Sequence, residues 1–471
     1  MSIATINPVD GRVVRSFGEM SDRQIDAAIG ESVDAFEKTR RADFGDRARW
    51  TRAAADILDA ERDDIARMVT TEMGKTYLAA KAEVAKCAAA CRFYADNART
   101  FLAEEPQDAA AVGATRAFVR YQPLGPVLAV MPWNFPLWQV IRFAAPALMA
   151  GNVCLLKHAS NVPQTALFLA ELFRRAGYPH AAFQTLLVGS RAVPGIVSDP
   201  RVRAVTLTGS EGAGRSIAEV AGREIKKTVL ELGGSDPFVV MPSADIVRAA
   251  RVATTSRCQN NGQSCIAAKR FIVHADVYEE FVEAFVAQMS ALRVGDPMDE
   301  GNDVGPLATE RGRDVVDQQV SDAVAKGARL RCGGRRPPGA GWWYPPTVVT
   351  DLTPAMRIWS EEVFGPVAAV YRVTSYRDAV RLANGTAFGL GANAWTDDPV
   401  EQEQFVADLD AGNVFINGMT TSFPTLPFGG VKNSGYGREL AAHGIREFCN
   451  VKTVWADDAG SGPEGPARHN E

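Results

Sequence analysis

A cysteine at the end of a polar, glycine-containing turn is the first residue in this chain whose setting could support chemistry. Cys265 follows the run NNGQS at 260–264, which comes after a segment of helical pattern ending near Ser256. A thiol attacks as thiolate, so a nucleophilic cysteine needs positive charge or hydrogen-bond donors that lower its pKa from about 8.5. A lone cysteine more often serves packing, and the turn by itself does not decide between the two roles.

Two further side chains stand at the ends of predicted strands. Glu231 lies between two leucines in LELGG, residues 230–234, where open α/β sheets place their ligand chemistry. A salt-bridged strand end would explain this carboxylate equally well. Asn134 is held between two prolines in PWNFP, residues 132–136. Such an amide can donate to a developing oxyanion, or it can simply cap a loop.

The elements that must position these residues form two α/β units. From Gly125, continuous apolar runs alternate with helical patterns, which predicts a doubly wound parallel sheet covered on both faces. A second alternation begins after Gly234, so the domain junction is expected near residue 233. Residues 116–124 alternate in polarity and predict an antiparallel strand with one exposed edge, which invites a partner subunit.

Long amphipathic segments precede the first sheet and are expected to pack on it. One is capped near Ser21, and two others span roughly 46–73 and 77–103, with Gly74 at a helix end.

Together these features resemble the aldehyde dehydrogenase superfamily, from Asn7 to about Trp455. Besides PWNFP, LELGG and GQSC, the chain carries EVFGP at 362–366 and PFGGVKNSG at 427–435, in the family's order and spacing. Each motif is weak singly, but their chance coincidence is negligible. The resemblance implies an α/β fold of the aldehyde dehydrogenase type, with two doubly wound parallel-sheet domains and a small β oligomerisation element.

The expected domain boundaries follow from this resemblance and from the pattern of elements. We expect a dinucleotide-binding domain over 1–105 and 125–233, a catalytic domain over 234–440, an oligomerisation element over 106–124 and 441–456, and a flexible tail over 457–471.

The resemblance also assigns catalytic roles. Cys265 would attack the aldehyde carbon, and the Asn134 amide with the Cys265 backbone N–H would hold the oxyanion of the thiohemiacetal. After hydride transfer, Glu231 would activate the water that hydrolyses the thioester. A relative that passes its acyl group to coenzyme A needs no such base, so Glu231 favours a free acid as product.

The dinucleotide site is expected to be atypical, because no GxGxxG run follows the first strand. The nearest match, GSEGAG at 209–214, follows a later strand and opens a helix. By resemblance, Glu362 bonds the nicotinamide ribose and Phe364 packs near the nicotinamide. The other residues expected to line the site by resemblance are Trp133, Gly209, Ser210 and Leu232.

Ser160 bears on the choice of dinucleotide. It stands where NAD-preferring relatives often carry a glutamate that would repel a 2′-phosphate, and Lys157 lies three residues earlier. A small hydroxyl beside a lysine leaves room for a charge-assisted phosphate contact. We therefore predict that NADP is preferred or that both NADP and NAD are accepted. The alternative is that Ser160 merely caps the following helix.

The prediction of the substrate class depends on Arg142. This arginine lies in a predicted helix that is apolar almost all round, so its buried guanidinium needs an anion. Trp138, four positions earlier, lies on the same face of that helix. The chain most resembles succinate-semialdehyde dehydrogenases through PWNFPLWQVIRFAAP and KHASNVP, and an arginine here would bind the distal carboxylate, with Ser422 assisting. An Arg142 paired to a structural carboxylate is the alternative. Gln259 stands where some relatives have a second arginine, which weakens the prediction.

Three other functions stay open. The substrate could be glutarate semialdehyde or a general aliphatic aldehyde, and more distantly the chain could be a non-catalytic binding protein. The intact Cys265, Glu231 and Asn134 argue against the last.

The composition of the chain limits the classes of partner that we expect. The net charge is -5 with no basic block, so we expect neither a nucleic-acid nor a membrane partner. We see no targeting or spanning segment and expect a cytoplasmic protein that acts on a small-molecule aldehyde as a homo-oligomer, either dimer or tetramer. The 7 cysteines are irregularly spaced and no metal-ligand pattern appears, so we expect no metal. Cys258 is the local candidate for a regulatory disulfide, although packing is the simpler role.

Overall fold

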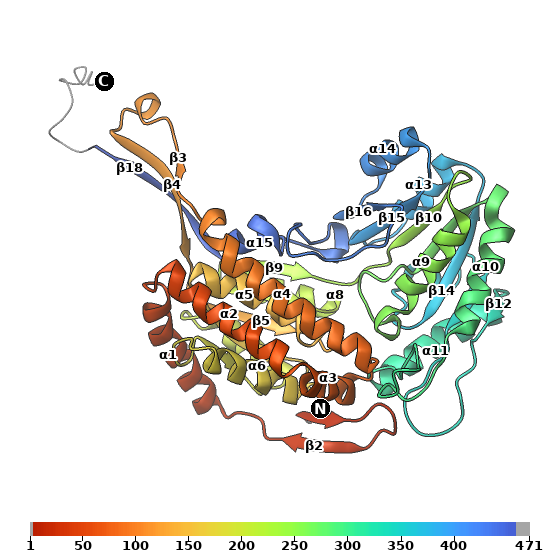
Figure 1. The fold of residues 1–471 in the computed structure, drawn as a ribbon, viewed down its shortest axis with the longest axis horizontal. Helices are drawn as coiled ribbons and strands as arrows, with labels where there is room; N and C mark the ends of the chain where they lie inside the picture. Colours follow the sequence, from red (N-terminus) through yellow and green to blue (C-terminus); the bar gives the residue numbers. More distant parts are fainter. Residues whose placement is uncertain (1–2, 458–471) are drawn as a thin grey trace.

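The computed structural model describes residues 3–457 and shows two α/β bodies with a projecting β arm (Figure 1). The predicted α/β class is confirmed. The N-terminal strands β1 (Ile3–Ile6) and β2 (Val13–Phe17) form a separate antiparallel hairpin at the foot of the first body.

The first body is built on a sheet of order β17-β9-β8-β5-β6-β7. All neighbours run parallel except β17 and β9. Alternate residues of β5 face opposite layers, because side chains alternate along a strand. The strands are Gly435–Tyr436 (β17), Lys227–Glu231 (β9), Ala204–Thr208 (β8), Pro126–Met131 (β5), Val153–His158 (β6) and Phe183–Thr185 (β7).

Helices cover both faces of this sheet, as continuous apolar strands require. Val127 and Ala129 of β5 join the core beneath α2, α4, α5 and α6, whereas Leu128 joins the core formed with α1, α7 and α8. The helices are Asp22–Thr39 (α1), Phe44–Ala60 (α2), Arg62–Met73 (α3), Tyr77–Phe101 (α4), Trp138–Ala150 (α5), Pro163–Arg175 (α6), Val193–Ser198 (α7) and Glu211–Arg223 (α8).

The N-terminal helices begin and end where the cap signals predict, with one difference. Ser21 forms a capping box with Gln24, and Gly74 ends α3 at φ 82°. The segment expected at 46–73 is two helices, because Glu61 leaves the helical conformation at φ −105°, ψ 18°.

The second body has a seven-stranded sheet of order β12-β13-β14-β11-β10-β15-β16, parallel except for β12. Its strands are Arg329–Cys332 (β12), Thr347–Thr350 (β13), Val367–Val373 (β14), Arg270–His274 (β11), Pro237–Val240 (β10), Gly391–Trp395 (β15) and Asn413–Ile416 (β16). One face packs against Ile246–Cys258 (α9) and Tyr278–Ala291 (α10), and the other against Glu310–Ala325 (α11), Tyr376–Asn384 (α13) and Pro399–Asp408 (α14).

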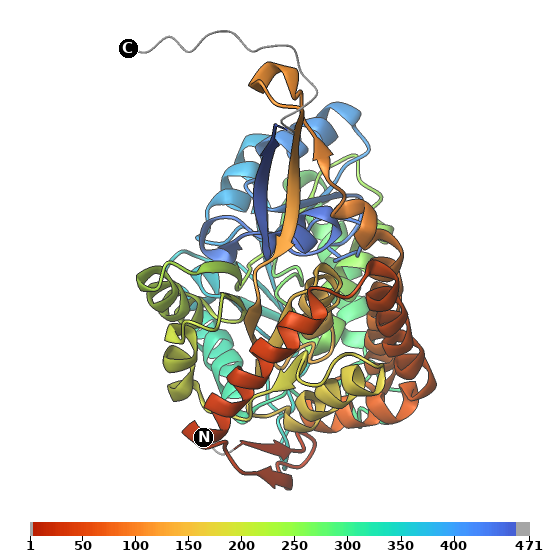
Figure 2. The same cartoon turned by 90° about the vertical axis from the view of Figure 1, so that its left-hand side faces the viewer.

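The arm is a three-stranded antiparallel sheet of order β18-β4-β3; it projects from the first body (Figure 1), and Figure 2 shows β18 and β4 side by side. β4 (Arg116–Pro123) lies between β3 (Glu105–Pro106) and β18 (Cys449–Ala456). The prediction of an antiparallel strand at 116–124 is therefore confirmed. β18 pairs along the whole of β4, whereas β3 pairs with β4 only at Phe118 and Val119, and within the described residues β18 and β3 are the two outer strands of the arm.

The tail expected over 457–471 lies almost wholly outside the described residues. No helix among residues 3–457 is long and apolar enough to cross a bilayer.

Candidate active site

The turn before Cys265 has a backbone that few residues adopt. Asn260 and Asn261 lie in the left-handed region at φ 54° and 57°, and Gly262 follows at φ 75°. Asparagine and glycine tolerate this region best. A Cβ on Gly262 would lie 2.3 Å from the carbonyl carbon of Gly365, so only glycine fits there. The turn thus ends α9 sharply and presents Cys265 between the two bodies.

Side-chain hydrogen bonds fix this turn. Asn261 Nδ2 donates to the carbonyl oxygens of Gly74, at 2.8 Å, and Pro306, at 2.9 Å. Asn260 Nδ2 donates to the carbonyl oxygen of Asn134 at 2.7 Å. Each asparagine therefore ties the nucleophile turn to a neighbouring segment of the chain.

The predicted oxyanion donor lies beside the turn. The amide of Asn134 is buried, and its Nδ2 donates to the carbonyl oxygen of Gln263 at 3.1 Å. An amide nitrogen has two hydrogens, so one remains available for a ligand. The structure thus brings Asn134 next to the Cys265 loop, although the two residues are 131 positions apart in the sequence (265 − 134 = 131).

Cys265 opens into a cavity of about 240 Å³. Burial raises the pKa of its thiol to about 12, while the charges of Arg142 and Lys269 act in the opposite direction. The electropositive surround expected from the sequence is present, but desolvation outweighs it. The thiol is therefore protonated at rest, and attack requires removal of its proton.

Glu231 ends β9 in a fully buried position. Burial holds the pKa of its carboxyl well above the usual range, and the positive charge of Arg142 only partly counters this. Among residues 3–457, no hydrogen-bond partner is found for Glu231 Oε1. A carboxyl with a raised pKa and a free oxygen is suited to accept a proton from water near neutral pH.

A second buried carboxylate, which the sequence reasoning missed, pairs with Arg142. The Arg142 guanidinium forms an ion pair with Glu439, and both side chains are almost fully buried. Arg142 also packs over the Phe428 ring at 4.8 Å and still lines the Cys265 cavity. The structural ion pair considered as the alternative for Arg142 is thus present, which leaves the predicted role in substrate binding to experiment.

Lys86 is another cavity residue that the sequence reasoning missed. Lys86 Nζ donates to Ser422 Oγ at 2.8 Å, and Trp138 Nε1 donates to the same oxygen at 3.1 Å. The structure thereby brings the predicted Trp138 and Ser422 together beside Cys265. A lysine on the α4 face that carries Ala79, Ala82 and Glu83 at helical spacing is the signal that could have revealed it.

The first body has a second cavity, near the predicted cofactor residue Lys157. A cavity of about 210 Å³ lies between α7 and α8, lined mostly by apolar side chains, with Lys157 at its wall. Burial lowers the pKa of the Lys157 ammonium group, while Glu19 acts to raise it. An apolar cavity beside a cation suits a base with a nearby phosphate.

The N-terminus of α8 has the features of a site for the phosphates of a dinucleotide. Ser210 caps this helix through Ala213 N at 3.4 Å, and Gly209 N donates to the carbonyl oxygen of Glu231 at 2.9 Å. A Cβ on Gly214 would lie 2.7 Å from Leu232 side-chain carbons, so glycine lets the helix pack closely against Leu232. The free N–H groups of such a helix start attract anions.

Glu362 is linked to the Cys265 loop through Lys269, and Phe364 packs against Trp133. Glu362 Oε1 accepts from Gly234 N at 3.1 Å and pairs with Lys269 at 3.4 Å. The rings of Trp133 and Phe364 meet edge to face at 5.8 Å. Lys269 in turn donates to the carbonyl oxygen of Cys265 at 2.7 Å, so the predicted ribose ligand is linked to the nucleophile loop.

The structure bears on the alternative roles of Ser160 and Cys258. The residue at the N-cap of α6 is Val162, without a side-chain cap bond, so Ser160 does not cap that helix. Cys258 packs in the core beside Met289, with the two sulfurs 3.6 Å apart.

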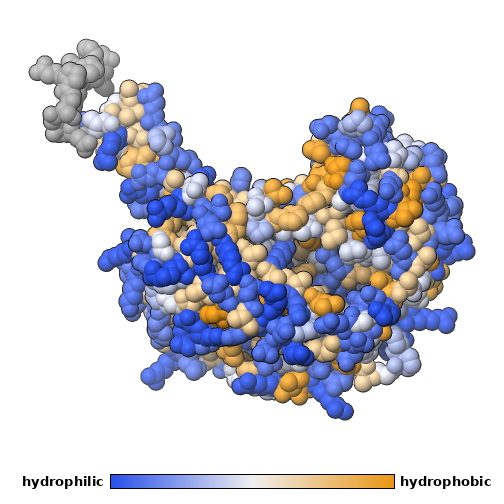
Figure 3. Space-filling model, in the orientation of Figure 1, coloured by the Kyte–Doolittle hydropathy of each residue, from blue (hydrophilic) through white to orange (hydrophobic). Residues whose placement is uncertain are grey.

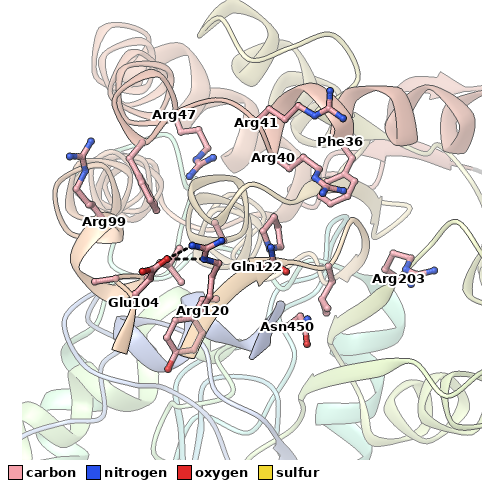
Figure 4. A pocket seen from close by; sticks show the side chains of 17 residues that line it. Phe36, Arg40, Arg41, Arg47, Arg99, Glu104, Arg120, Gln122, Arg203 and Asn450 are labelled. Atoms are coloured by element: carbon pink, nitrogen blue, oxygen red, sulfur yellow. Dashed lines mark hydrogen bonds and ion pairs between the residues drawn. The ribbon is translucent and has the colours of Figure 1, made fainter. Parts of the chain in front are cut away.

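A further cavity lies at the base of the arm (Figure 4). It measures about 780 Å³ and shares no lining residue with the Cys265 cavity. Its wall carries the arginines Arg40, Arg41, Arg47, Arg99, Arg120 and Arg203.

Comparisons with known proteins agree with this geometry. Residues 1–454 match the model of the Aldehyde dehydrogenase family, and the chain belongs to that family. It is 64% identical over 455 residues to succinate-semialdehyde dehydrogenase (NADP+) 1 of Mycobacterium tuberculosis, covering 97% of this chain and 100% of the relative. It is 62% identical to succinate-semialdehyde dehydrogenase (NADP+) of Mycobacterium avium, covering 99% of each.

A solved structure supports the same fold. Succinic semialdehyde dehydrogenase from Streptococcus pyogenes, in complex with NADP+, superposes with a TM-score of 0.94 at 36% identity, covering 97% of this chain and 100% of that one.

Proposed function

We propose that this protein oxidises succinate semialdehyde to succinate with NADP. The observation that carries the proposal is one cavity holding the nucleophile candidate Cys265 together with the cationic side chains of Lys86 and Arg142. A neutral aldehyde would gain nothing from buried cations, whereas an aldehyde that bears a carboxylate would. The names of the mycobacterial relatives and of the Streptococcus pyogenes structure support the same substrate.

The residues suit a two-stage reaction. The Cys265 sulfur attacks the aldehyde carbon as its proton passes to water, and the oxyanion is held by Asn134 Nδ2 and the Cys265 backbone N–H. The dinucleotide, when bound, would accept a hydride from that carbon, and a thioester on Cys265 would remain. Glu231 then takes a proton from water, the hydroxyl oxygen adds to the thioester carbon, and the carbon–sulfur bond breaks to release the acid. Overall, aldehyde, NADP+ and water give carboxylate, NADPH and two protons.

The dinucleotide would be held by residues of both bodies. Lys157 and Ser160 leave space and charge for a 2′-phosphate, which favours NADP, with NAD also accepted. The base would lie between α7 and α8, the phosphates at Gly209 and Ser210, and the nicotinamide near Leu232, Trp133 and Phe364, with Glu362 on its ribose.

Initial rates test this proposal. Succinate semialdehyde, glutarate semialdehyde and butanal are compared by kcat/KM, each with NADP and with NAD. We expect the highest value for succinate semialdehyde with NADP. If glutarate semialdehyde is used better, the substrate is a longer semialdehyde acid; equal values for all three aldehydes would refute an acid substrate.

We further propose a cytoplasmic homo-oligomer that assembles through residues 106–124 and 441–456. Val451, Trp455 and Val112 of the arm are more than half exposed, and the outer edge of β18 is unpaired among the described residues. Figure 3 shows apolar residues on the arm and on the opposite wall of the notch that it borders. The arginine-lined cavity at the arm's base includes residues of β4 and β18, so we assign it to this interface. Light scattering during size-exclusion chromatography tests the assembly, and a monomer would refute it.

A further inference from the structure

The cavity at the base of the arm has more positive charge on its wall than the chain balances. The wall carries six arginines and one acid, Glu104, which pairs with Arg120 (Figure 4). Glu37, outside the wall, pairs with both Arg40, at 3.2 Å, and Arg41, at 3.1 Å. Among residues 3–457, no ion pair joins the other arginines of the wall to a carboxylate; these are Arg47, Arg99 and Arg203.

Arg47 is the buried member of this set. It is 5% exposed, and its Nη1 donates to the carbonyl oxygens of Thr39, at 3.3 Å, and Ala42, at 2.7 Å. Its buried Nε has no hydrogen-bond partner in the part of the chain that the structure describes. Burial lowers the pKa of the guanidinium group, with Tyr178 and Asp43 among the groups that act in the opposite direction. A buried cation with an unused donor is stabilised when an anion enters.

Two phenylalanine rings hold the arginines of the wall near one another. The guanidinium carbon of Arg47 lies 4.5 Å from the centre of the Phe44 ring, and that of Arg99 lies 5.8 Å from the same centre. The guanidinium carbon of Arg40 lies 5.4 Å from the centre of the Phe36 ring. Contact with the rings offsets part of the repulsion between these like charges, and an anion among them would offset more of it.

The wall of this cavity belongs to both the arm and the first body. Gln122 of β4 and Asn450 of β18 face each other on paired strands and line the cavity together with Arg47 of α2 and Arg99 of α4 (Figure 4). The volume of about 780 Å³ lies within the range of small-molecule sites. A ligand in the cavity would therefore contact the arm and the first body at once.

We propose that this cavity binds a small multivalent oxyanion, a polyphosphate or a polycarboxylate, which ties the arm to the first body. Guanidinium groups bind the charged oxygens of both classes in the same forked geometry. The low exposure of Arg47 favours a small anion over the acidic side chains of a second copy of the chain. In the proposed assembly the anion would lie at the interface formed by the arm. The site is independent of the proposed oxidation, because the cavity shares no lining residue with that of Cys265.

Calorimetric titration of the full chain with tripolyphosphate and with citrate tests the inference. Saturating NADP is present throughout, so that the proposed dinucleotide site is not open to the probe. We expect one binding event per chain with at least one of the two anions, and a higher melting temperature in its presence; the tighter binder identifies the class of ligand. No binding of either anion at about 1 mM would overturn the inference. That result is also the one expected if a second copy fills the cavity.

Substitutions locate the binding event. Arg47→Gln should raise the Kd roughly 10- to 100-fold, because a hydrogen bond to a charged group is lost. Arg47 also holds two carbonyl groups between α1 and α2, so Arg40→Gln, at an exposed position of the same wall, gives a second measurement and should raise the Kd roughly 3- to 10-fold. The matched control is Arg52→Gln on α2, since Arg52 is an exposed arginine that pairs with Asp96 at 2.6 Å. It should keep the wild-type Kd.

The pattern across the variants decides between a built site and general attraction. An equal rise of the Kd in all three variants, or no rise in Arg47→Gln and Arg40→Gln, would overturn the inference. If size-exclusion chromatography shows a monomer that binds the anion with the same dependence on Arg47, the proposed assembly fails while the anion site stands.

Discussion

The pH dependence of substrate choice follows from the setting of Lys86. Burial lowers its pKa to about 8, with Arg142 acting in the same direction and Cys87 and Glu83 acting against it. Below that pH the ammonium group adds its positive charge to the Cys265 cavity; above it the proton and the charge are lost. The charged fraction drops from about 0.9 at pH 7 to about 0.1 at pH 9. The kcat/KM ratio of succinate semialdehyde to butanal should therefore fall severalfold over that range, with about tenfold as the upper limit, because the cavity offers less positive charge to a substrate carboxylate.

The assay measures both aldehydes from pH 6.5 to 9.5 at saturating NADP. Ionisation of Cys265 affects both aldehydes alike and cancels in the ratio, so the fall reports a charge that acts on the carboxylate. Lys86→Arg should give a flat ratio, since a guanidinium keeps its charge throughout. A constant wild-type ratio, or the same fall in Lys86→Arg, would refute this reasoning.

Three further predictions concern the chemistry and the dinucleotide. Asn134→Ala should lower kcat with succinate semialdehyde about 10²- to 10³-fold, because one oxyanion donor is lost; a loss under tenfold would exclude that role. Glu231→Gln should release about one NADPH per active site rapidly and then turn over roughly 10²-fold or more slower, since the thioester persists; rapid-mixing absorbance would show the burst, and its absence would place Glu231 before hydride transfer. Ser160→Glu should shift the kcat/KM preference toward NAD by about tenfold or more, because a carboxylate repels the 2′-phosphate; an unchanged ratio would move the discrimination to other residues.

The sequence predicted most of the helices and strands because their ends are determined by a few neighbouring residues. The capping box at Ser21 and the left-handed Gly74 depend on a few neighbouring residues, and the structure has both. Glu61 shows the limit, since the amphipathic pattern continues through a residue at which the backbone leaves the helix. The pairing of β4 with β18 could not be predicted from local patterns, because β18 lies more than 300 positions after β4 in the sequence.

The sequence by itself determined which residues can do chemistry: the turn NNGQS before Cys265, the carboxylate of Glu231 and the amide of Asn134 are recognisable from residue type and motif order. Only the tertiary structure decided which charges face one another. It set Arg142 against Glu439 and left Lys86 with Ser422, in contacts that join residues about 300 positions apart. Burial then decided the protonation of the Cys265 thiol. Desolvation depends on every layer packed around a group, so the electrostatics of this site exist only in the folded chain.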